Sequence, residues 1–479
     1  MTTAVAIPGT LGVLIPKRRM QKSSVHKIAL GLVWMTVALG GFVFMEPAPV
    51  DLLTVALLVL LPVIGLFDAK PAITGGFALW LVVAACGIFS SIMARDTPAS
   101  ILHMGVSFYL YAACFLFAGF VAKNPLAHLR LILNANLVAG IAAAALGIIG
   151  YLDLIPGAFD LFTKFGRASG PFKDPNVFGP FLIAGLLTSL HLWLTRPASR
   201  GALPLAGAGL LTIAILFSFS RGAWAAAGIA VAVYGYLYSI TAARNLDRVK
   251  LAALVLLGSA ILGLVLAVSL QSDSVARLLQ ERAALTQTYD EGVEGRFGGQ
   301  EKAFELILEN ALGIGARDFT QYYHHEEVHN VYLSMMLNAG WLGGLIYLLL
   351  CAGTLMLGFE HALKRTKTQA LFLIVFAALA GNVVEGLLID SDHWRHFYLL
   401  MGLNWGLMAG DRRQVRASRI VRDRRPLLML PVLIVPPSSR QARIVGRVPK
   451  RVALPRGRLP VAPQRRRPRR SARLVLQTR

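Results

Sequence analysis

The sequence predicts an all-α polytopic membrane protein with about 12 transmembrane helices and a large loop between helices 9 and 10. Two observations carry this prediction: the composition of the chain and the number of its long apolar segments. Of the 479 residues, 56% are hydrophobic and 15% are charged, and the mean hydropathy is +0.60. A soluble domain carries roughly 25% charged residues. The composition therefore excludes both an ordinary soluble enzyme and a disordered protein.

The apolar segments set the expected number of helices. A helix needs about 20 apolar residues to cross the bilayer core, and in lipid a helix satisfies its own backbone hydrogen bonds. Twelve segments reach or approach this length, and each is predicted to span the membrane: 27–46, 50–67, 74–94, 101–121, 129–151, 176–195, 202–219, 222–240, 250–269, 330–357, 369–389 and 396–410.

The basic residues of the short loops predict the orientation, because lysine and arginine concentrate on the cytoplasmic side. With a cytoplasmic N-terminus these residues fall inside at nearly every turn, and both termini are then cytoplasmic. The expected organisation is a cytoplasmic segment 1–26, a transmembrane bundle 27–410 and a cytoplasmic tail 411–479. The two longer loops, 152–175 and 270–329, face the outside.

The net charge of +23 is concentrated in the tail. Residues 411–479 hold 21 of the 48 Lys+Arg and 2 of the 25 Asp+Glu, a net charge of +19, together with 9 of the 23 prolines. Such an Arg/Pro-rich strip without apolar periodicity is expected to be disordered. Contact with anionic lipid of the inner leaflet is its expected use, and no nucleic-acid partner is predicted.

Cationic residues at the outer ends of the helices oppose the orientation bias and mark the candidate site. A guanidinium binds phosphate in a two-point contact. We therefore predict that Arg167, Arg221 and Arg296 converge on a bound phosphate group, while snorkelling to lipid phosphate is the alternative for Arg221. Further candidates for substrate binding lie in the same outer segments: Lys173, Asn176, Asn330, Glu385, Asp392, His393 and Arg395.

His329 stands where the large loop meets the segment 330–357. A neutral imidazole accepts a proton from a hydroxyl, so His329 is predicted to act as a general base or to orient the substrate. The alternative is a polar residue that caps the following helix. A zinc site with His324 and His325 is disfavoured because no cysteine joins these residues and no HExxH pattern is present. No metal ion is predicted.

Two further segments carry ionisable groups. Residues 299–310 have the pattern of an amphipathic helix, whose Glu301, Glu305 and Glu309 form a stripe that is predicted to be solvated. Glu385 lies inside an apolar segment, which makes it a functional candidate. An ion pair with Arg395 or another outer arginine is its alternative role.

Four blocks in this order resemble the bacterial O-antigen ligase/polymerase family. They are Arg167 with Gly170-Pro171-Phe172 and Asp174-Pro175-Asn176, then Ser220-Arg221-Gly222, then Gly295-Arg296 and the helix leading to Leu312-Gly313-Ile314-Gly315, and His329-Asn330 with residues 337–343. The segment from Asp392 to Phe397 resembles family members tied to exopolysaccharide repeat-unit polymerisation. The basic tail departs from the family.

The resemblance implies a GT-C-like, metal-independent and inverting glycosyltransferase of the bacterial inner membrane. Its donor is a glycan on undecaprenyl diphosphate, and its acceptor is a saccharide or lipid A–core. By this resemblance Arg221 and Arg296 hold the diphosphate and His329 activates the acceptor hydroxyl. No cofactor is expected; membrane lipids and a chain-length regulator or export machinery are the further partners.

The resemblance leaves the ligase and polymerase activities open, and we favour the polymerase. A transporter or flippase of lipid-linked oligosaccharide is the alternative, because about 12 helices suit either class. Transporters place polar groups near the bilayer midplane, whereas the polar residues of this sequence lie at one face. An assembly subunit that recruits partners through the basic tail is a third interpretation.

Overall fold

The computed structural model describes residues 18–241, 245–269, 292 and 295–424. Helices make up 78% of the structure, so the predicted all-α class is confirmed. The bundle belongs to one compact unit that ends at Asp423. The predicted N-terminal segment is described only from Arg18, where the first helix begins, and residues 425–479 of the predicted tail lie outside the described residues.

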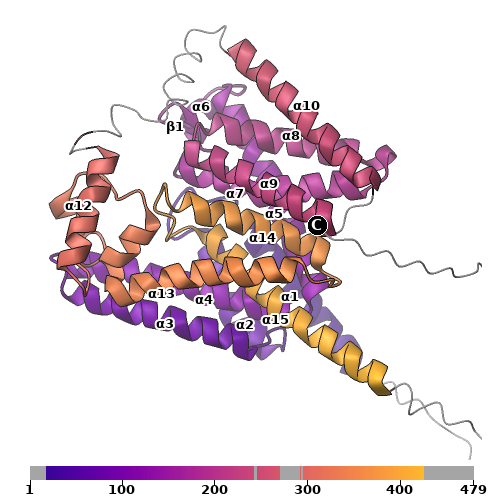
Figure 1. Ribbon diagram of the computed structural model, residues 1–479, viewed down its shortest axis with the longest axis horizontal. Coiled ribbons are helices and arrows are strands. Elements are labelled where there is room, and N and C mark those ends of the chain that lie inside the picture. Colours follow the sequence, from indigo (N-terminus) through magenta and orange to yellow (C-terminus); the bar gives the residue numbers. More distant parts are fainter. Residues whose placement is uncertain (1–17, 242–244, 270–291, 293–294, 425–479) are drawn as a thin grey trace, which may run out of the picture. The chain divides into compact units, whose positions relative to one another are not determined.

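Each of the predicted apolar segments forms a helix (Figure 1). These helices are α1 (Arg18–Leu39), α2 (Pro49–Val63), α3 (Pro71–Ile92), α4 (Thr97–Lys123), α5 (Pro125–Tyr151), α7 (Pro175–Thr195), α8 (Ala202–Phe217), α9 (Arg221–Thr241), α10 (Asn245–Ser269), α13 (Val331–Ala362), α14 (Gln369–Glu385) and α15 (Arg395–Arg424). Helix α15 continues past the predicted boundary at Gly410.

Six of the described helices, α3, α4, α5, α7, α9 and α13, are long and apolar enough to cross a membrane. Helices α2, α8 and α14 and the part of α1 from Ser24 onward are apolar but shorter. The chain is therefore a multi-pass membrane protein. Its number of spans, predicted as about 12, and its orientation stay predictions.

Proline sets the start of several helices. Pro49, Pro71, Pro125 and Pro175 each occupy the first helical position, where the missing N–H group has no intrahelical partner to lose. Before Pro175, the Asp174 side chain accepts a hydrogen bond from the Asn176 amide at 2.7 Å. Helix α7 thus begins at a position that the sequence itself specifies.

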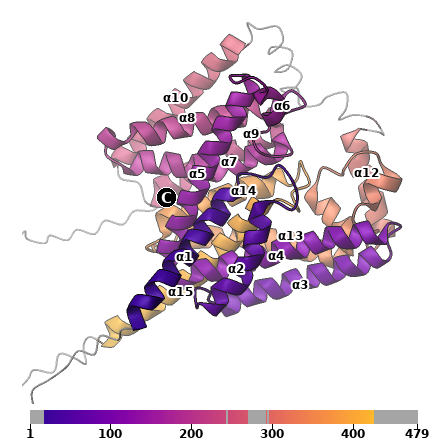
Figure 2. The same ribbon diagram turned by 180° about the vertical axis from the view of Figure 1, so that it is seen from behind.

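The centre of the bundle is an aromatic cluster where α3, α4, α13 and α15 meet. Trp80 stacks on Tyr111 with ring centroids 4.3 Å apart, and both Tyr347 and Tyr398 pack edge-on against Trp80. All four side chains are fully buried. Helices α3 and α13 lie side by side in both ribbon views (Figures 1 and 2).

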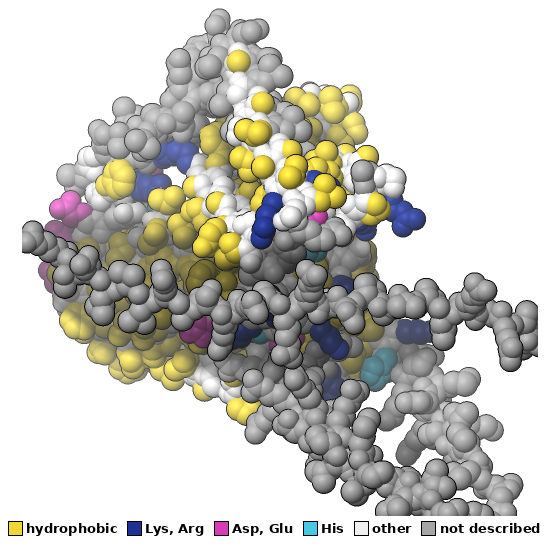
Figure 3. All heavy atoms as spheres, turned by 45° about the vertical axis from the view of Figure 1, so that its right-hand side comes forward, with side chains coloured by type: hydrophobic (Ala, Val, Ile, Leu, Met, Phe, Trp, Pro, Cys, Tyr) yellow, Lys and Arg dark blue, Asp and Glu magenta, His cyan; other side chains and the backbone are white. Residues whose placement is uncertain are grey.

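Large apolar side chains remain exposed on the outside of the helices. Val59, Leu203, Leu256 and Met356 are each at least two-thirds exposed. Figure 3 shows hydrophobic side chains covering much of the described surface on one face of the molecule. Such a surface is costly in water and matches a lipid environment.

The connections at one end of the bundle carry small elements of their own. Between α5 and α7 lie α6 (Ala158–Phe162) and a hairpin of β1 (Thr163–Lys164) and β2 (Arg167–Ala168). Between α10 and α13 lie α12 (Arg296–Glu309) and the short π-helix η2 (Phe319–Tyr323).

Helix α12 confirms the predicted amphipathic helix, and its three glutamates are exposed as expected. Its packing face consists of Ala303, Leu306 and Ile307, which are buried, while Phe297 and Phe304 are about half exposed. These buried positions share the helical spacing, and the small Ala303 side chain allows a close approach to the bundle.

Candidate functional site

A cavity of about 460 Å³ lies among α1, α4, the segment before α7 and the loop between α14 and α15. Four of the predicted site residues line it, namely Lys173, Asp392, His393 and Arg395. The charged and histidine side chains of its wall are Glu46, His103, Lys173, Asp174, Arg317, Glu327, Asp390, Asp392, His393, Arg395 and His396. The wall therefore offers charged and hydrogen-bonding groups beside apolar side chains such as Phe172 and Phe181.

Arg395, on this wall, forms a two-point ion pair with Asp51. Its Nε and Nη2 donate to the two carboxylate oxygens of Asp51 at 2.7 and 2.9 Å, and its Nη1 lies 3.3 Å from Glu46. Lys173 approaches Glu46 from the other side at 3.0 Å. Burial would raise the pKa of Glu46, yet Lys173 and Arg395 together hold it below its ordinary value. The alternative pairing of Arg395 with Glu385 is wrong, since Asp51 and Glu46 occupy the guanidinium.

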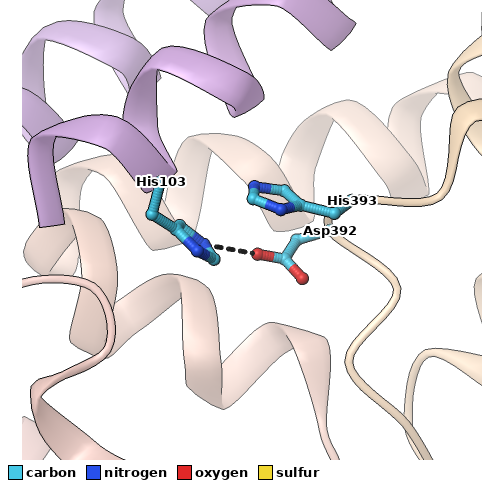
Figure 4. A group of neighbouring side chains, drawn as sticks. All are labelled: His103, Asp392 and His393. Carbon is cyan, nitrogen blue, oxygen red and sulfur yellow. Dashed lines mark hydrogen bonds and ion pairs between the residues drawn. The ribbon is translucent and has the colours of Figure 1, made fainter. Parts of the chain in front are cut away.

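Asp392 and His393 meet a third residue, His103 of α4 (Figure 4). His103 Nε2 lies 3.2 Å from Asp392 Oδ2, and the two imidazole rings stack with centroids 4.0 Å apart. Burial raises the pKa of Asp392, but the two histidines outweigh it and keep the carboxyl well below its ordinary value. Burial lowers the pKa of His393 to about 4.

Sequence reasoning missed His103. It is the only histidine in the apolar segment 101–121, which holds no Asp, Glu, Lys or Arg. A polar ionisable residue within an apolar membrane segment is a functional candidate, so a usable signal existed. The partners of His103 lie 289 and 290 positions later in the chain, and sequence spacing cannot join residues so far apart.

Asp390 connects His329 to the cavity. Its carboxylate accepts the backbone N–H of His329 at 2.8 Å and the hydroxyl of Ser334. Burial and the neighbouring Asp392 raise the pKa of Asp390 to about 6. Asp390 lines the cavity, so its hydrogen bond connects the backbone of His329 to the cavity wall.

His329 sits in a strained loop conformation at φ +54°, a region that non-glycine residues seldom adopt. Burial and then Arg296 lower the pKa of His329, against the opposing charges of Glu327, Glu326 and Asp174. The imidazole of His329 is therefore neutral over a wider pH range than that of an ordinary histidine. The alternative role of a helix cap belongs instead to Asn330, whose Oδ1 accepts the amides of Tyr332 and Leu333 at 3.1 and 3.3 Å.

Arg296 is the first residue of α12 and holds two loops together. Its Nη2 donates to the carbonyl oxygen of Leu388 and lies 3.4 Å from the carbonyl oxygen of His329. The helix that the sequence predicted thus places Arg296 directly against the predicted histidine.

Arg167 connects the β1–β2 hairpin to the start of α9. The hairpin turn uses positive φ at Phe165 and Gly166, as a tight two-residue turn requires. The buried Arg167 donates from Nε to the Ser218 carbonyl and from Nη2 to Asn176 Oδ1, each at 2.7 Å. Two separately predicted site residues, Arg167 and Asn176, are thus in direct contact.

Arg221 is the first residue of α9 and follows closely after Ser218, which Arg167 contacts. The first turn of α9 packs on Glu385. A Cβ atom on Gly222 would lie 2.9 Å from Glu385 Oε1. Glu385 is 1% exposed, and neither carboxylate oxygen has a hydrogen-bond partner among the described residues. Three residues beyond Glu385, Leu388 contacts Arg296. Contacts therefore link Arg167 to Ser218 before α9, and the segment from Glu385 to Leu388 links the first turn of α9 to Arg296. The convergence of the three arginines on a phosphate group stays a prediction.

The three histidines of the disfavoured zinc site do not form a ligand group in the described part of the chain. His324 and His325 stack with centroids 4.8 Å apart, and His329 Nε2 lies 3.8 Å from Glu326. In the described part of the chain, their ring nitrogens do not form a group close enough to share an ion.

Comparison with known proteins finds a family match over part of the chain. Residues 206–348 match the family model described as O-Antigen ligase. This range runs from within α8 into α13 and contains Arg221, Arg296 and His329. No curated protein sequence matches the chain. The resemblance inferred from the sequence blocks is therefore confirmed.

Proposed function

Residues 206–348 match the O-antigen ligase family model, and from that match we propose that the protein transfers a glycan from undecaprenyl diphosphate to an acceptor saccharide. The reaction takes place at the periplasmic face of the inner membrane during synthesis of a surface polysaccharide. The observation that carries the proposal is the junction of Arg296, His329 and Asp390, which adjoins a polar cavity and joins the family-matched segment to it.

The chemistry needs a stabilised leaving group. The acceptor oxygen attacks the anomeric carbon, the bond from that carbon to the diphosphate oxygen breaks, and the configuration inverts. Negative charge grows on the departing diphosphate. Fixed cations at that position lower the barrier, and Arg221 and Arg296 supply them without a metal ion. Arg167 orders the turn before Arg221 through Ser218.

The acceptor hydroxyl must lose its proton as it attacks. His329 receives it, because its lowered pKa keeps the imidazole neutral near neutral pH. Asp390 fixes the backbone of His329 by accepting its N–H, which makes Asp390 a positioning residue. The proton then leaves the imidazole for water.

The cavity supplies the acceptor subsite. Lys173, Asp392, His393 and Arg395 offer hydrogen-bonding groups, and Trp394 adds an aromatic surface. Sugars combine many hydroxyls with apolar ring faces, and this mixture of side chains suits both. Residues 392–396 of the segment that resembles polymerising members line this cavity. A growing glycan chain joined to the next lipid-linked repeat is therefore favoured over lipid A–core as the acceptor.

A direct assay tests the proposal. Purified protein in detergent is supplied with lipid-linked repeat units, and chain elongation is followed by electrophoresis of labelled glycan. Arg221→Ala and Arg296→Ala are each expected to slow elongation by about 10²- to 10³-fold, and His329→Ala by about 10²- to 10⁴-fold.

Two controls match these variants. Lys302→Ala changes an exposed cation of α12, and His325→Ala changes an exposed histidine near His329; both should elongate chains at the normal rate. Full-length polysaccharide from the Arg221, Arg296 and His329 variants at normal expression would overturn the proposal. Micelles have no second compartment, so a flippase would give no elongated product in this assay.

A further inference from the structure

We propose that His103, Asp392 and His393 form a binding site for a divalent transition-metal ion, with Zn²⁺ as the preferred ion, on the wall of the cavity. The ligand atoms of the three residues lie within 4.8 Å of one another. Figure 4 shows the Asp392 carboxylate directed toward His103, with the His393 ring beside them. The sequence predicted no metal, and the site differs from the His324–His325–His329 group considered there.

The distance between His103 and Asp392 suits a shared ion. Zinc–nitrogen and zinc–oxygen bonds of about 2.0–2.1 Å place two tetrahedral ligand atoms roughly 3.3 Å apart. His103 Nε2 and Asp392 Oδ2 are 3.2 Å apart. A charge-assisted hydrogen bond between such groups is usually shorter, at about 2.7–2.9 Å. The observed spacing is thus close to the edge of a metal-centred tetrahedron.

The hydrogen bonds around His393 leave one ring nitrogen available as a ligand. The Ser107 hydroxyl donates to the His103 carbonyl at 3.3 Å, so its oxygen can accept from His393 Nε2 at 2.9 Å. Nε2 then carries the proton, and Nδ1 carries the lone pair. Metal-binding histidines commonly donate their other N–H to such a partner, and Ser107 fills that role here.

The rest of the fold holds the three ligands in place. The Tyr398 hydroxyl donates to the Asp392 carbonyl at 2.8 Å, and Tyr398 is itself fully buried against Trp80. His103 is carried by the long helix α4. The ligands therefore belong to a supported surface, which reduces the ordering cost of binding an ion.

The ligand set indicates the kind of ion. Two imidazoles and one carboxylate bind Zn²⁺, and the same set also binds Fe²⁺. Three protein ligands leave at least one coordination position open. Since all three residues line the cavity, the open position is available to water or to a sugar oxygen. The diphosphate-binding arginines do not depend on this ion, so metal binding and glycan transfer can be measured separately.

Metal content and titration test the inference without any transfer reaction. Full-length protein, purified in detergent without a polyhistidine tag, is dialysed and titrated with Zn²⁺ by calorimetry and with Co²⁺ by visible absorption. The wild type should bind one ion per chain with the d–d spectrum of tetrahedral Co²⁺. His103→Gln and His393→Gln should lose both signals, and His325→Gln should keep them.

Ser107→Ala separates binding from folding, because it removes a supporting hydrogen bond and keeps all three ligands. It should weaken Zn²⁺ affinity about 10- to 100-fold. Absence of stoichiometric binding by the wild type would overturn the inference. Equal binding by the wild type and a folded His103→Gln variant would also overturn it, since the ion would then sit elsewhere. Neither result would affect the proposed transfer, which is scored by elongation alone.

Discussion

The ion pair between Arg395 and Asp51 fixes the start of α15 to the start of α2, and breaking it should destabilise the protein. The guanidinium and the carboxylate make a two-point contact at 2.7 and 2.9 Å. The Asp51 side chain is 11% exposed and that of Arg395 is 21% exposed. The perturbation is Arg395→Met, which keeps a long apolar side chain and removes the charge.

The expected cost follows from what Asp51 loses and what it keeps. Removing one partner of a buried ion pair costs about 3–5 kcal/mol because the other charge stays buried. Asp51 retains two hydrogen bonds, from the Ala48 amide at 2.7 Å and the Tyr109 hydroxyl at 3.0 Å. The cost of Arg395→Met should therefore be about 2–4 kcal/mol.

A double-mutant cycle measures the pair itself. Unfolding in mixed micelles of increasing denaturing-detergent fraction gives the free energies of the wild type, Arg395→Met, Asp51→Asn and the double variant. We expect a coupling energy of about 1.5–3 kcal/mol. The matched control is the exposed pair Lys302 and Glu305 on α12, at 3.0 Å, with an expected coupling of about 0.2–0.5 kcal/mol. Equal coupling in the two cycles would refute the reasoning.

Two further predictions concern backbone strain and pH. Gly340 has φ +65° and ψ −177°, and a Cβ atom there would lie 2.7 Å from the Ala311 carbonyl oxygen, so Gly340→Ala should destabilise by about 3 kcal/mol or more. Gly353→Ala, where the Cβ meets nothing within 4 Å, should stabilise by up to about 1 kcal/mol, and comparable unfolding curves for the two variants would contradict the strain argument. The folded-state pKa of His329 is lowered, so elongation should persist as the pH falls through about 6.5 and decline only below it. Below about pH 6.5 the unfolded state binds a proton on His329 more readily than the folded state, so the free energy of unfolding falls as the pH falls. The His329→Gln variant should lack this part of the decrease. Identical curves of unfolding free energy against pH for the wild type and the variant would contradict the prediction.

The fold could be predicted from the sequence as far as local patterns determine it. Hydropathy located the helices because each apolar segment must satisfy its own backbone hydrogen bonds in lipid. The proline residues at first helical positions marked several starts, such as Pro125 and Pro175. The extent of α15 was underestimated, because its polar continuation beyond Gly410 has no hydropathy signal.

The candidate site could be predicted only in part. Topology placed Arg296 and His329 at the same end of the bundle, and the structure puts the arginine 3.4 Å from the histidine carbonyl oxygen. Asn330 was predicted to bind substrate, and the structure shows its side chain capping α13. Asp51 was not predicted at all, although it holds Arg395, because the two residues are 344 positions apart.

The sequence by itself determined the class of the protein, the position of its helices and the end of the bundle where the unusual charges gather. These properties depend on hydropathy and charge within short segments, and both can be calculated directly from the sequence. Tertiary structure alone decided which charges meet: Arg395 with Asp51, His329 with Asp390, and His103 with Asp392. The physical reason is that such pairs depend on the rotation and packing of whole helices, and many distant side chains contribute to that packing.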